Sequence, residues 1–548
     1  MTRNTDSHFG NIPTKTIRRS KFKRPCSHKL TANVGQIIPI YRDELLPGDS
    51  CKIKLSSLVR MTTPINPVMD NAWMDIYFFA IPRRLVWEHW KEFMGENTTD
   101  EWTQTTEYTI PKTTAPKGGW AKGSIADYMG ARINTEDIWI DSCYLRAYTL
   151  CYNEWFRNEN ISEPAAMSKG DATTAGSNGT DYVNDLEKGG MPAQAVKFAD
   201  YLTRALPEPQ KGDPVFVPLG GTVPVLGNGM ALGLTDGTND LGAVTSNTQL
   251  IGGNTANLGD DVGETAGGGS GLAAIKTIGI TEDGDKSGLI ADLSKSTQGA
   301  TIGQLREAYS VQKLMEQWAR GGTRYIENIR TNFGVTSPDA RQQRPEYIGG
   351  ARIPVNMTEV VQQSETNTTP MGDTAGKSLT IDSRDMVSYA STEHSIILGL
   401  MVIRCEHTYQ QNIERLLHRQ SKYDFYWPAL SNISEQPIYE YEIFAQGTAD
   451  DDDVFGYQEA WADYRYAQNR ISGELNSDYA YPLDSWHYGD DYTSAPALSD
   501  AWIKEPTTNL ARTLAVQDQD QFICDFYFDQ TWVRPMPVYS VPGLTGWH

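Results

Sequence analysis

The chain is poor in the features that mark exported, membrane-bound and disulfide-stapled proteins. Its longest apolar run, residues 396–403 (IILGLMVI), is far shorter than the roughly 20 residues that cross a bilayer. The opening segment MTRNTDSHFGNIP has no apolar stretch of the kind that a signal peptide carries. The cysteines form neither a CxxC pair nor a disulfide framework: Cys26, Cys51, Cys143, Cys151, Cys405 and Cys524. We therefore expect a soluble chain with free thiols, folded in a reducing cytosol, without Sec export and without membrane insertion.

Positive charge is also scarce. The 48 Lys and Arg residues face 69 Asp and Glu residues, which gives a formal net charge of −21. This excludes a protein that coats nucleic acid over its whole surface, so any nucleic-acid contact must be local. With 548 residues, 39% of them hydrophobic, the chain can bury a large core, which excludes disordered and collagen-like classes. Length suggests about two to four domains, although one large β domain with long insertions remains open.

Residues 1–30 have a local excess of positive charge, because they hold eight Lys and Arg residues and Asp6 as the only acid. This composition predicts a basic N-terminal arm, because a cationic segment gains free energy by releasing counterions from a polyanion. The alternative is a solvated tail that binds nothing. The candidate phosphate-binding residues are Lys15, Arg18, Arg19, Lys21, Lys23, Arg24 and Lys29.

Aromatic residues are absent between Phe216 and Tyr309. Within that stretch, residues 219–292 hold 18 glycines and nine acids, including the tract GETAGGGSG. A segment of this composition builds little core, so we expect a surface insertion in which short strands can still pair. A flexible linker is the alternative.

The remaining sequence predicts a mainly β fold. Strand-length runs rich in aromatic or β-branched residues occur at 73–81, 396–403, 522–528 and, broken by prolines, 533–541. Several are apolar on both faces, which favours strands between a second sheet and overlying loops. Apolar residues at steps of three and four predict helices at 145–156, at 302–318 before Gly321 and Gly322, and at 325–333. We therefore expect an antiparallel sandwich with helices inserted in its connections.

Motifs for catalysis or metal binding are weak. Gly376, Lys377 and Ser378 are similar to the end of a Walker A loop, but no apolar strand precedes them, and Ser270 lacks the second glycine of a nucleophile elbow. Cys405, His407 and His418 match no zinc spacing, which favours core or surface roles. The acid run at 450–453 lacks the alternation of an EF-hand loop and is typical of a solvated turn. We predict no catalytic residue, no metal ligand and no cofactor.

Aromatic residues are plentiful elsewhere, with 27 tyrosines and 14 tryptophans. They crowd at 423–427 (YDFYW) and 461–466 (WADYRY). Such residues pack cores, anchor protein interfaces or stack on bases, and the sequence leaves these three roles open.

Several long strings resemble one family. The run ARGGTRY at 319–325 continues through FGVTSPDAR at 333–341 to RPEY at 344–347. Together they resemble the major capsid protein of the microviruses, small single-stranded DNA phages, in their gokushovirus branch. The likeness continues, in the same order, at 41–49 (YRDELLPGD), 145–160 (LRAYTLCYNEWFRNEN), 423–430 (YDFYWPAL), 454–459 (VFGYQE), 483–487 (LDSWH) and 534–543 (RPMPVYSVPG).

The resemblance implies an eight-stranded viral jelly roll with long loop and helical insertions, spanning residues 31–548 as one domain behind the arm of residues 1–30. It implies self-assembly through pentamers into a T=1 icosahedral shell around circular single-stranded DNA, and no enzyme. It also implies a virion component assembled in the cytoplasm of a host bacterium, with a small basic packaging protein and a minor pilot protein as further partners. Residues 219–292 correspond to the family's variable threefold protrusion, which is expected to meet a host-cell receptor.

Two other classes of protein fit the bare composition. A cellular jelly-roll carbohydrate-binding protein or glycoside hydrolase also combines a sandwich with aromatic loops, and it would need a cleft with converging carboxylates. An accessory spike or scaffold protein would account for the glycine-rich stretch without shell formation.

Overall fold

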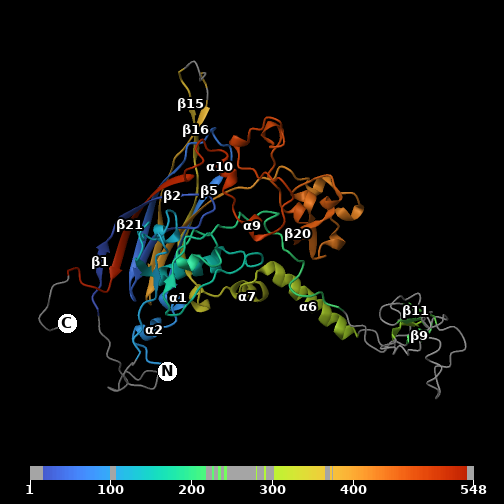
Figure 1. Cartoon of the computed structure of the whole chain (residues 1–548), viewed down its shortest axis with the longest axis horizontal. Helices are drawn as coiled ribbons and strands as arrows, with labels where there is room; N and C mark the ends of the chain where they lie inside the picture. The colour runs from blue at the N-terminus through green and yellow to red at the C-terminus, as the bar shows by residue number, and fades with distance from the viewer. Residues whose placement is uncertain are drawn as a thin grey trace, which may run out of the picture. The chain divides into compact units, whose positions relative to one another are not determined.

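The computed structural model describes residues 17–98, 106–216, 225–227, 233–235, 240–243, 279–280, 289–291, 301–364, 371–372 and 374–539 (Figure 1). By internal contacts the chain divides into two units. The first combines Met1–Lys211 with Glu316–His548, and the second is Gly212–Met315.

Two antiparallel sheets form the centre of the first unit. In one sheet the order is β1-β21-β4-β17, and β2 follows β1 along the same edge of β21. In the other sheet the order is β14-β5-β18-β3. The strands of the first sheet are β1 (Ser20–Lys23), β2 (Cys26–Ala32), β4 (Ser50–Met61), β17 (Thr380–Ala390) and β21 (Phe522–Arg534). Those of the second are β3 (Ile38–Leu45), β5 (Ala72–Pro82), β14 (Glu346–Pro354) and β18 (Ser395–Cys405).

The strand order identifies the topology. Because β1 and β2 occupy one edge position in succession, they count as a single strand, which gives eight strands in chain order. The first sheet then reads 1-8-3-6 and the second 2-7-4-5. This is the order of an eight-stranded jelly roll built from two Greek keys. The predicted mainly β, antiparallel sandwich is confirmed.

The main core lies between the two sheets. Along β4 every second residue is buried, with Ile53, Leu55 and Val59 facing inward. Phe78 of the second sheet and Phe528 of the first join the same cluster, and the ring centroids of Tyr41 and Phe528 are 4.8 Å apart. The period of two in β4 matches the strand repeat, so its other side chains face solvent.

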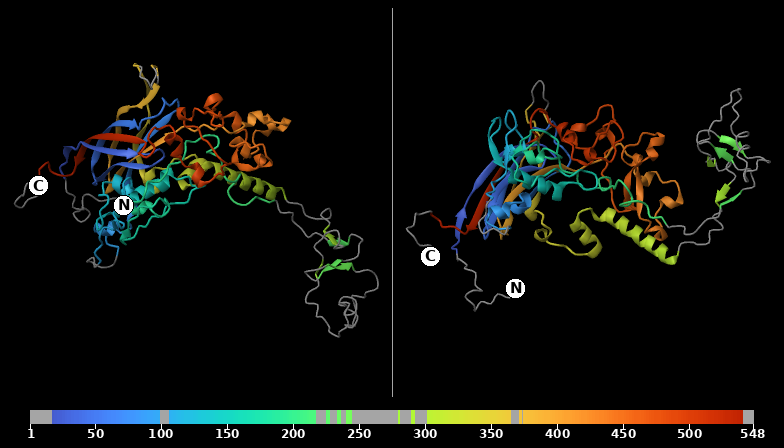
Figure 2. Two further views of the ribbon diagram at one scale, coloured as in Figure 1. Left: turned by 45° about the horizontal axis from the view of Figure 1, so that its top comes forward. Right: turned by 60° about the horizontal axis from the view of Figure 1, so that its bottom comes forward.

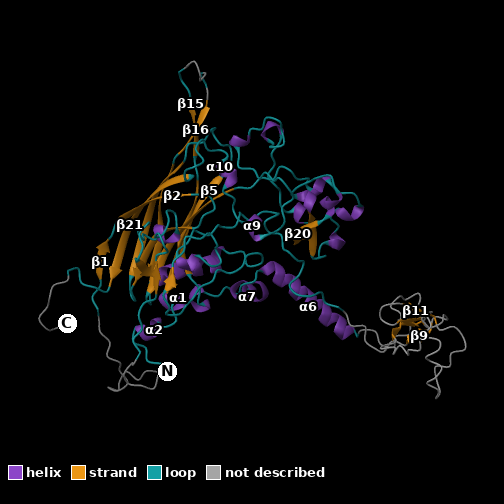
Figure 3. Cartoon of the chain, in the orientation of Figure 1, coloured by secondary structure: helices purple, strands orange, loops and turns teal. Residues whose placement is uncertain are grey.

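The second sheet is buried on both faces. Its far face packs under helices α1 (Arg83–Val86), α3 (Ile125–Tyr128) and α4 (Ser142–Cys151), whose apolar residues form a separate cluster. Strand β18 is accordingly buried at nearly every position. Figure 3 shows these helices and their loops beside the strands. Some strands were expected to be apolar on both faces, and β18 confirms this because helices cover the face that points away from the main core.

The connections between strands carry short elements of their own. A third apolar cluster joins residues 196–205 to the long stretch between β18 and β21. The remaining strands of the first unit are β6 (Lys112–Thr114), β7 (Trp139–Asp141), β8 (Thr174–Ala175), β15 (Met357–Val361), β16 (Thr374–Ser378), β19 (Glu435–Tyr439) and β20 (Val454–Glu459). Its remaining α-helices are α2 (Trp90–Phe93), α7 (Tyr325–Phe333), α8 (Asp339–Gln342), α9 (Asp500–Ile503) and α10 (Thr508–Ala511). Short 3-10 or π turns are η2 (Tyr152–Phe156), η3 (Leu186–Lys188), η5 (Arg415–Leu417), η6 (Lys422–Asp424), η7 (Pro428–Leu430), η8 (Glu440–Glu442), η9 (Ala449–Asp452), η10 (Ala462–Tyr464), η11 (Gly473–Leu475) and η12 (Asp484–Trp486).

The second unit contains the whole of the predicted insertion, and the greater part of residues 219–292 lies outside the described residues. Its described strands pair in the orders β11-β10-β12 and β13-β9. They are β9 (Val225–Gly227), β10 (Gly233–Thr235), β11 (Asp240–Ala243), β12 (Gly279–Ile280) and β13 (Leu289–Ala291). Helix α6 (Ile302–Gly321) begins in this unit and ends in the first.

Most predicted elements are confirmed, and one strand is wrong. The helices expected at 145–156, 302–318 and 325–333 correspond to α4 with η2, to α6 and to α7 (Figure 2). The strand expected at 533–541 is formed only at Val533 and Arg534, where β21 ends, and residues 540–541 lie outside the described residues. Pro535 and Pro537 lack the N–H that a sheet ladder requires. Among the described residues, no helix is both long and apolar enough to cross a membrane.

Candidate nucleic-acid interface

The outer face of the first sheet carries a group of cations. In β4 the residues that alternate with the buried apolar positions include Lys52, Lys54 and Arg60, and all three are exposed. In β1, Phe22 packs against the main core, so Lys21 and Lys23 face outward. We call the outward residues Lys21, Lys23, Lys29, Lys52, Lys54 and Arg60 the cationic face.

Strand register brings these cations from distant parts of the chain into rows. Lys23 of β1 and Lys52 of β4 both pair with Thr531 of β21, from opposite sides. In the strand register, Lys54 lies opposite Asp529, and Lys29 lies opposite Asp525. Neighbouring strands lie about 4.8 Å apart, so Lys23 and Lys52, which flank Thr531, belong to strands about 10 Å apart.

Most of this positive charge is not neutralised. Lys29 lies 3.5 Å from Asp525, and Lys52 lies 3.4 Å from Asp385, but both pairs are exposed and therefore weak. In the described part of the chain, the side chains of Lys21, Lys23, Lys54 and Arg60 form no ion pair or hydrogen bond. Six cations thus face three acids, Asp385, Asp525 and Asp529, on a chain whose net charge is −21.

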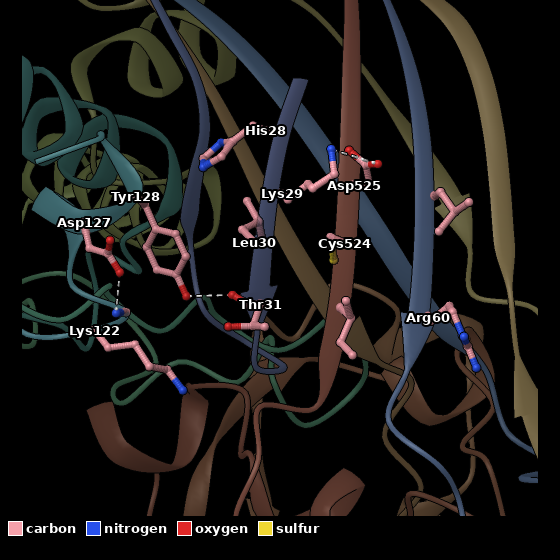
Figure 4. A pocket seen from close by; sticks show the side chains of 13 residues that line it. His28, Lys29, Leu30, Thr31, Arg60, Lys122, Asp127, Tyr128, Cys524 and Asp525 are labelled. Atoms are coloured by element: carbon pink, nitrogen blue, oxygen red, sulfur yellow. Dashed lines mark hydrogen bonds and ion pairs between the residues drawn. The ribbon is translucent and has the colours of Figure 1, made fainter. Parts of the chain in front are cut away.

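A pocket of about 560 Å³ opens between this face and α3 (Figure 4). Lys29, Arg60 and Lys122 lie among its lining residues. Tyr128 crosses it and donates a hydrogen bond from its hydroxyl to the carbonyl of Thr31 at 2.8 Å. Lys122 pairs with Asp520 at 2.9 Å. The lining therefore combines cations with Asp127, Asp525 and apolar residues, and Lys29 and Lys122 are already paired with acids.

The predicted site residues are only partly brought together. Lys21, Lys23 and Lys29 belong to the cationic face, and Arg18 and Arg19 are exposed just before β1. Arg24 turns to the edge of the sandwich instead, where it pairs with Asp43 at 2.8 Å and lies over the ring of Trp532. Lys15 lies outside the described residues. Strand pairing begins at Ser20, inside the segment 1–30 assigned to the arm, because Phe22 and Leu30 contribute to the core.

Lys52, Lys54, Arg60 and Lys122 were missed by sequence reasoning. The first three share a signal, since the string SCKIKLSSLVRM alternates apolar and polar residues over residues 50–61. That alternation predicts a half-buried strand with cations on the open face. Lys122 has no such signal, because only tertiary packing brings its loop beside the sheet.

His407 is a buried residue that lies between two carboxylates of the core. Its Nδ1 is 3.0 Å from Asp490 and its Nε2 is 2.9 Å from Glu505, and all three side chains are buried. Burial alone would lower the pKa of His407, but the two carboxylates outweigh it and raise this pKa to about 9. His418 instead packs on the ring of Tyr441 at 4.4 Å, so Cys405, His407 and His418 do not converge.

The other weak motifs that the structure describes lie in a strand and in an exposed turn. Gly376 to Ser378 lie within strand β16, and the acids at 450–453 form the exposed turn η9 and its end. Ser270 lies outside the described residues. Within the described ranges, no group of three or more His, Cys, Asp or Glu side chains could hold a metal ion. All six cysteines are free thiols.

The fold and this face together define a class of protein. Eight-stranded jelly rolls occur in viral capsid proteins, lectins and cupins. A cationic sheet face on an otherwise acidic chain favours the first of these, because a shell around a polyanion needs opposite charge on one side only.

Comparison with known proteins identifies the family. The family model described as capsid protein (F protein) matches residues 10–544. Curated relatives are capsid protein VP1 of Spiroplasma virus 4, 41% identical over 96% of both chains, and capsid protein VP1 of Bdellovibrio phage phiMH2K, 37% identical over 99% of both. Capsid protein VP1 of Chlamydia phage 1 is 35% identical over 98% of both chains. The chain belongs to the capsid protein (F protein) family.

This membership confirms the resemblance to the microvirus capsid proteins of the gokushovirus branch. The chain is a structural component of a virion that assembles with copies of itself, and it is not an enzyme. The alternative of a cellular lectin or glycoside hydrolase is not favoured.

Proposed function

We propose that this chain forms a T=1 icosahedral shell around circular single-stranded DNA, and that the cationic face lines the inside of the shell. The observation that carries the second part is the excess of cations over acids on one sheet face of an acidic chain. Among the described residues, Lys21, Lys23, Lys54 and Arg60 of this face form no ion pair. Each exposed lysine that meets a phosphate releases a condensed counterion, and this gain does not depend on sequence. Identical subunits of a shell meet different stretches of the genome, so they need a binding mode that does not depend on base sequence.

The cationic face also offers a base-stacking position. Tyr527 of β21 is about half exposed, and its register neighbours are Ser27 of β2 and Ser56 of β4. Small serines on both sides leave the tyrosine ring open to a base. Lys29 and Lys54 lie one row away on either side, within reach of the flanking phosphates.

The segment before β1 extends the same function. Lys15, Arg18 and Arg19 precede the first lysine of β1, so they add charge next to the cationic face. A small basic packaging protein and a minor pilot protein share the interior in this proposal. Residues 219–292 form the threefold protrusion that meets the host-cell receptor, and the shell assembles in the host's cytoplasm.

The experiment is to express the full chain with its genome and sediment the product. We expect closed particles that protect single-stranded DNA from nuclease. A chain that stays monomeric at every concentration contradicts the shell, and particles that assemble and pack DNA equally well without the cationic residues contradict the assigned inner face. Carbohydrate binding by a small oligomer would favour the lectin alternative.

A further inference from the structure

A loop of the first unit exposes an unusual number of aromatic side chains. In residues 420–430, here called the aromatic loop, Tyr423 is 64% exposed and Trp427 is 51% exposed. Phe425 and Tyr426 are also exposed. Contiguous apolar patches of this kind mark interaction surfaces, because a free subunit gains nothing by holding them in water.

The aromatic loop is held in shape without burying its rings. Asp424 accepts hydrogen bonds from the backbone N–H groups of Gln420 at 2.9 Å and Ser421 at 2.6 Å. The indole N–H of Trp427 donates to the carbonyl of Lys422 at 2.7 Å. A surface fixed before contact loses little conformational entropy on binding, which is a property of interface anchors.

The charges around the loop argue against DNA as the occupant. Arg419 is buried and pairs with Asp463, and Arg415 pairs with Glu442 at 2.7 Å. The acids at 450–453 adjoin the loop, since Asp452 and Tyr423 line the same cavity of about 380 Å³. The loop's own Lys422, which lies over the ring of Tyr423, is offset by Asp424 in the same turn. With its arginines neutralised and the acid run beside it, the surface carries net negative charge, which repels a polyanion and attracts a cationic partner.

The same chain presents a surface of the complementary kind. In residues 325–341, here called the α7–α8 surface, Tyr325 is 71% exposed and Phe333 is 77% exposed. Arg330 and Arg341 are exposed on it, and among the described residues their side chains form no ion pair or hydrogen bond. Its acids are already engaged, because Glu327 contacts Arg324 and Asp339 contacts Arg344.

We propose that the aromatic loop of one copy packs against the α7–α8 surface of a second copy. Aromatic rings meet aromatic rings, and the acids at 450–453 approach Arg330 and Arg341. Two different patches in contact make a heterologous interface, which closes into rings and shells when repeated by symmetry. This inference rests on the proposed shell function and specifies one contact within it.

The first test removes the anchors. Tyr423→Ala combined with Trp427→Ala should raise the subunit concentration needed for assembly by about tenfold or more, the effect of losing interface hot spots. The melting temperature of the unassembled subunit should fall only slightly, because both side chains are exposed and the one hydrogen bond lost, from Trp427 to Lys422, is local to the loop. The matched control is Ile381→Ala, an equally exposed apolar residue on the cationic sheet, which should assemble as the wild type does.

The second test exchanges the charges. Arg330→Glu with Arg341→Glu should block assembly, and so should Asp450→Lys with Asp452→Lys. Combining all four substitutions in one chain should restore assembly, because the reversed charges of each surface then meet opposite charges on the next copy.

The outcomes of these tests distinguish failure of the inferred contact from failure of the proposed function. Normal assembly of the aromatic variant overturns the interface, and failure of the chain with all four charge substitutions to assemble overturns its assignment to the α7–α8 surface. Intact shells that lose DNA would assign the loop to the genome instead and also overturn the inference. Wild-type chains that never assemble overturn the proposed function itself, whereas wild-type shells with unaffected variants overturn only this contact.

Discussion

Arg324, in the string ARGGTRY, connects distant parts of the first unit through one side chain. It donates to the carbonyl groups of Asn153 at 2.8 Å and Arg157 at 2.9 Å. It also pairs with Glu159 at 2.8 Å. The unusual string that supports the family resemblance thus includes a residue that fixes α7 to the segment after α4.

We expect Arg324→Lys to lower the free energy of unfolding by about 2 kcal/mol, because an ammonium cannot reproduce the planar fork that reaches two carbonyls and a carboxylate. Urea denaturation of the unassembled subunit measures this. Arg330→Lys is the matched control on the same helix, since Arg330 is exposed, and it should leave stability unchanged. Equal stability of both variants would contradict the role of Arg324.

His407 makes stability depend on pH. Its pKa is about 9 in the folded chain against 6.5 for an ordinary histidine, and Lys197 also faces the shared Asp490 at 3.2 Å. A raised pKa means that the stabilisation is complete below pH 6.5 and is lost as pH rises through 9. The shift corresponds to about 3 kcal/mol at most.

We expect the wild-type subunit to lose stability between pH 6.5 and 9.5, and the His407→Gln variant to be less stable at pH 6.5 with a flatter profile. Thermal unfolding across this range measures both. His418→Gln, which changes an exposed histidine, should keep the wild-type slope. A His407→Gln profile parallel to that of the wild type would refute the assignment.

At the scale of elements, one glycine controls how β14 joins the sandwich. The register between β14 and β5 shifts between Tyr347 and Gly349, which marks a bulge. A Cβ at Gly349 would lie 2.0 Å from the carbonyl oxygen of Met386 in β17. Since backbone cannot yield as a side chain does, the close approach of the two sheets here requires glycine.

Gly349→Ala should therefore destabilise the subunit by about 2 kcal/mol or more, as expected for overpacking against backbone. Chemical denaturation of the purified subunit gives the value. Gly170→Ala is the control, because a Cβ there meets its nearest neighbour at an ordinary 3.6 Å. A Gly349→Ala variant as stable as this control would show that the sheets can separate at no cost.

The cationic face is the second feature at this scale, because it exists only across strands. Replacing Lys21, Lys23 and Lys54 with Gln should weaken binding of a single-stranded oligonucleotide by dissociated subunits and lower the slope of log affinity against log salt by about 2. The control replaces Lys117, Lys169 and Lys377, which are exposed elsewhere, with Gln. Equal salt slopes for the two triple variants would remove this face from the DNA interface.

At the scale of the whole molecule, the two units divide the work. The first unit contains the jelly roll, the cationic face and both surfaces of the inferred subunit contact. The second contains the aromatic-poor insertion. In the proposed function the first unit forms the shell and the second meets the host cell.

We expect that replacing residues 219–292 with a short Gly-Ser linker leaves shell formation and DNA content unchanged but abolishes attachment to the host cell. Sedimentation and a cell-binding assay measure the two outcomes separately. Failure of the shortened chain to form shells would instead make the insertion part of the assembly contacts.

The sequence alone determined the class of this protein. Strand-length runs rich in aromatic or β-branched residues predicted β5, β18 and the start of β21, helical spacing predicted α4, α6 and α7, and long unusual strings predicted the capsid family, because each of these signals is contiguous in the chain. Tertiary structure decided what is assembled across strands and loops. Lys52, Lys54 and Arg60 join Lys21 and Lys23 only through register with β21, and Arg24 leaves the predicted set only because Asp43 of a neighbouring sheet lies beside it. A sequence specifies which side chains point the same way along one strand, whereas pairing between distant strands specifies which charges meet.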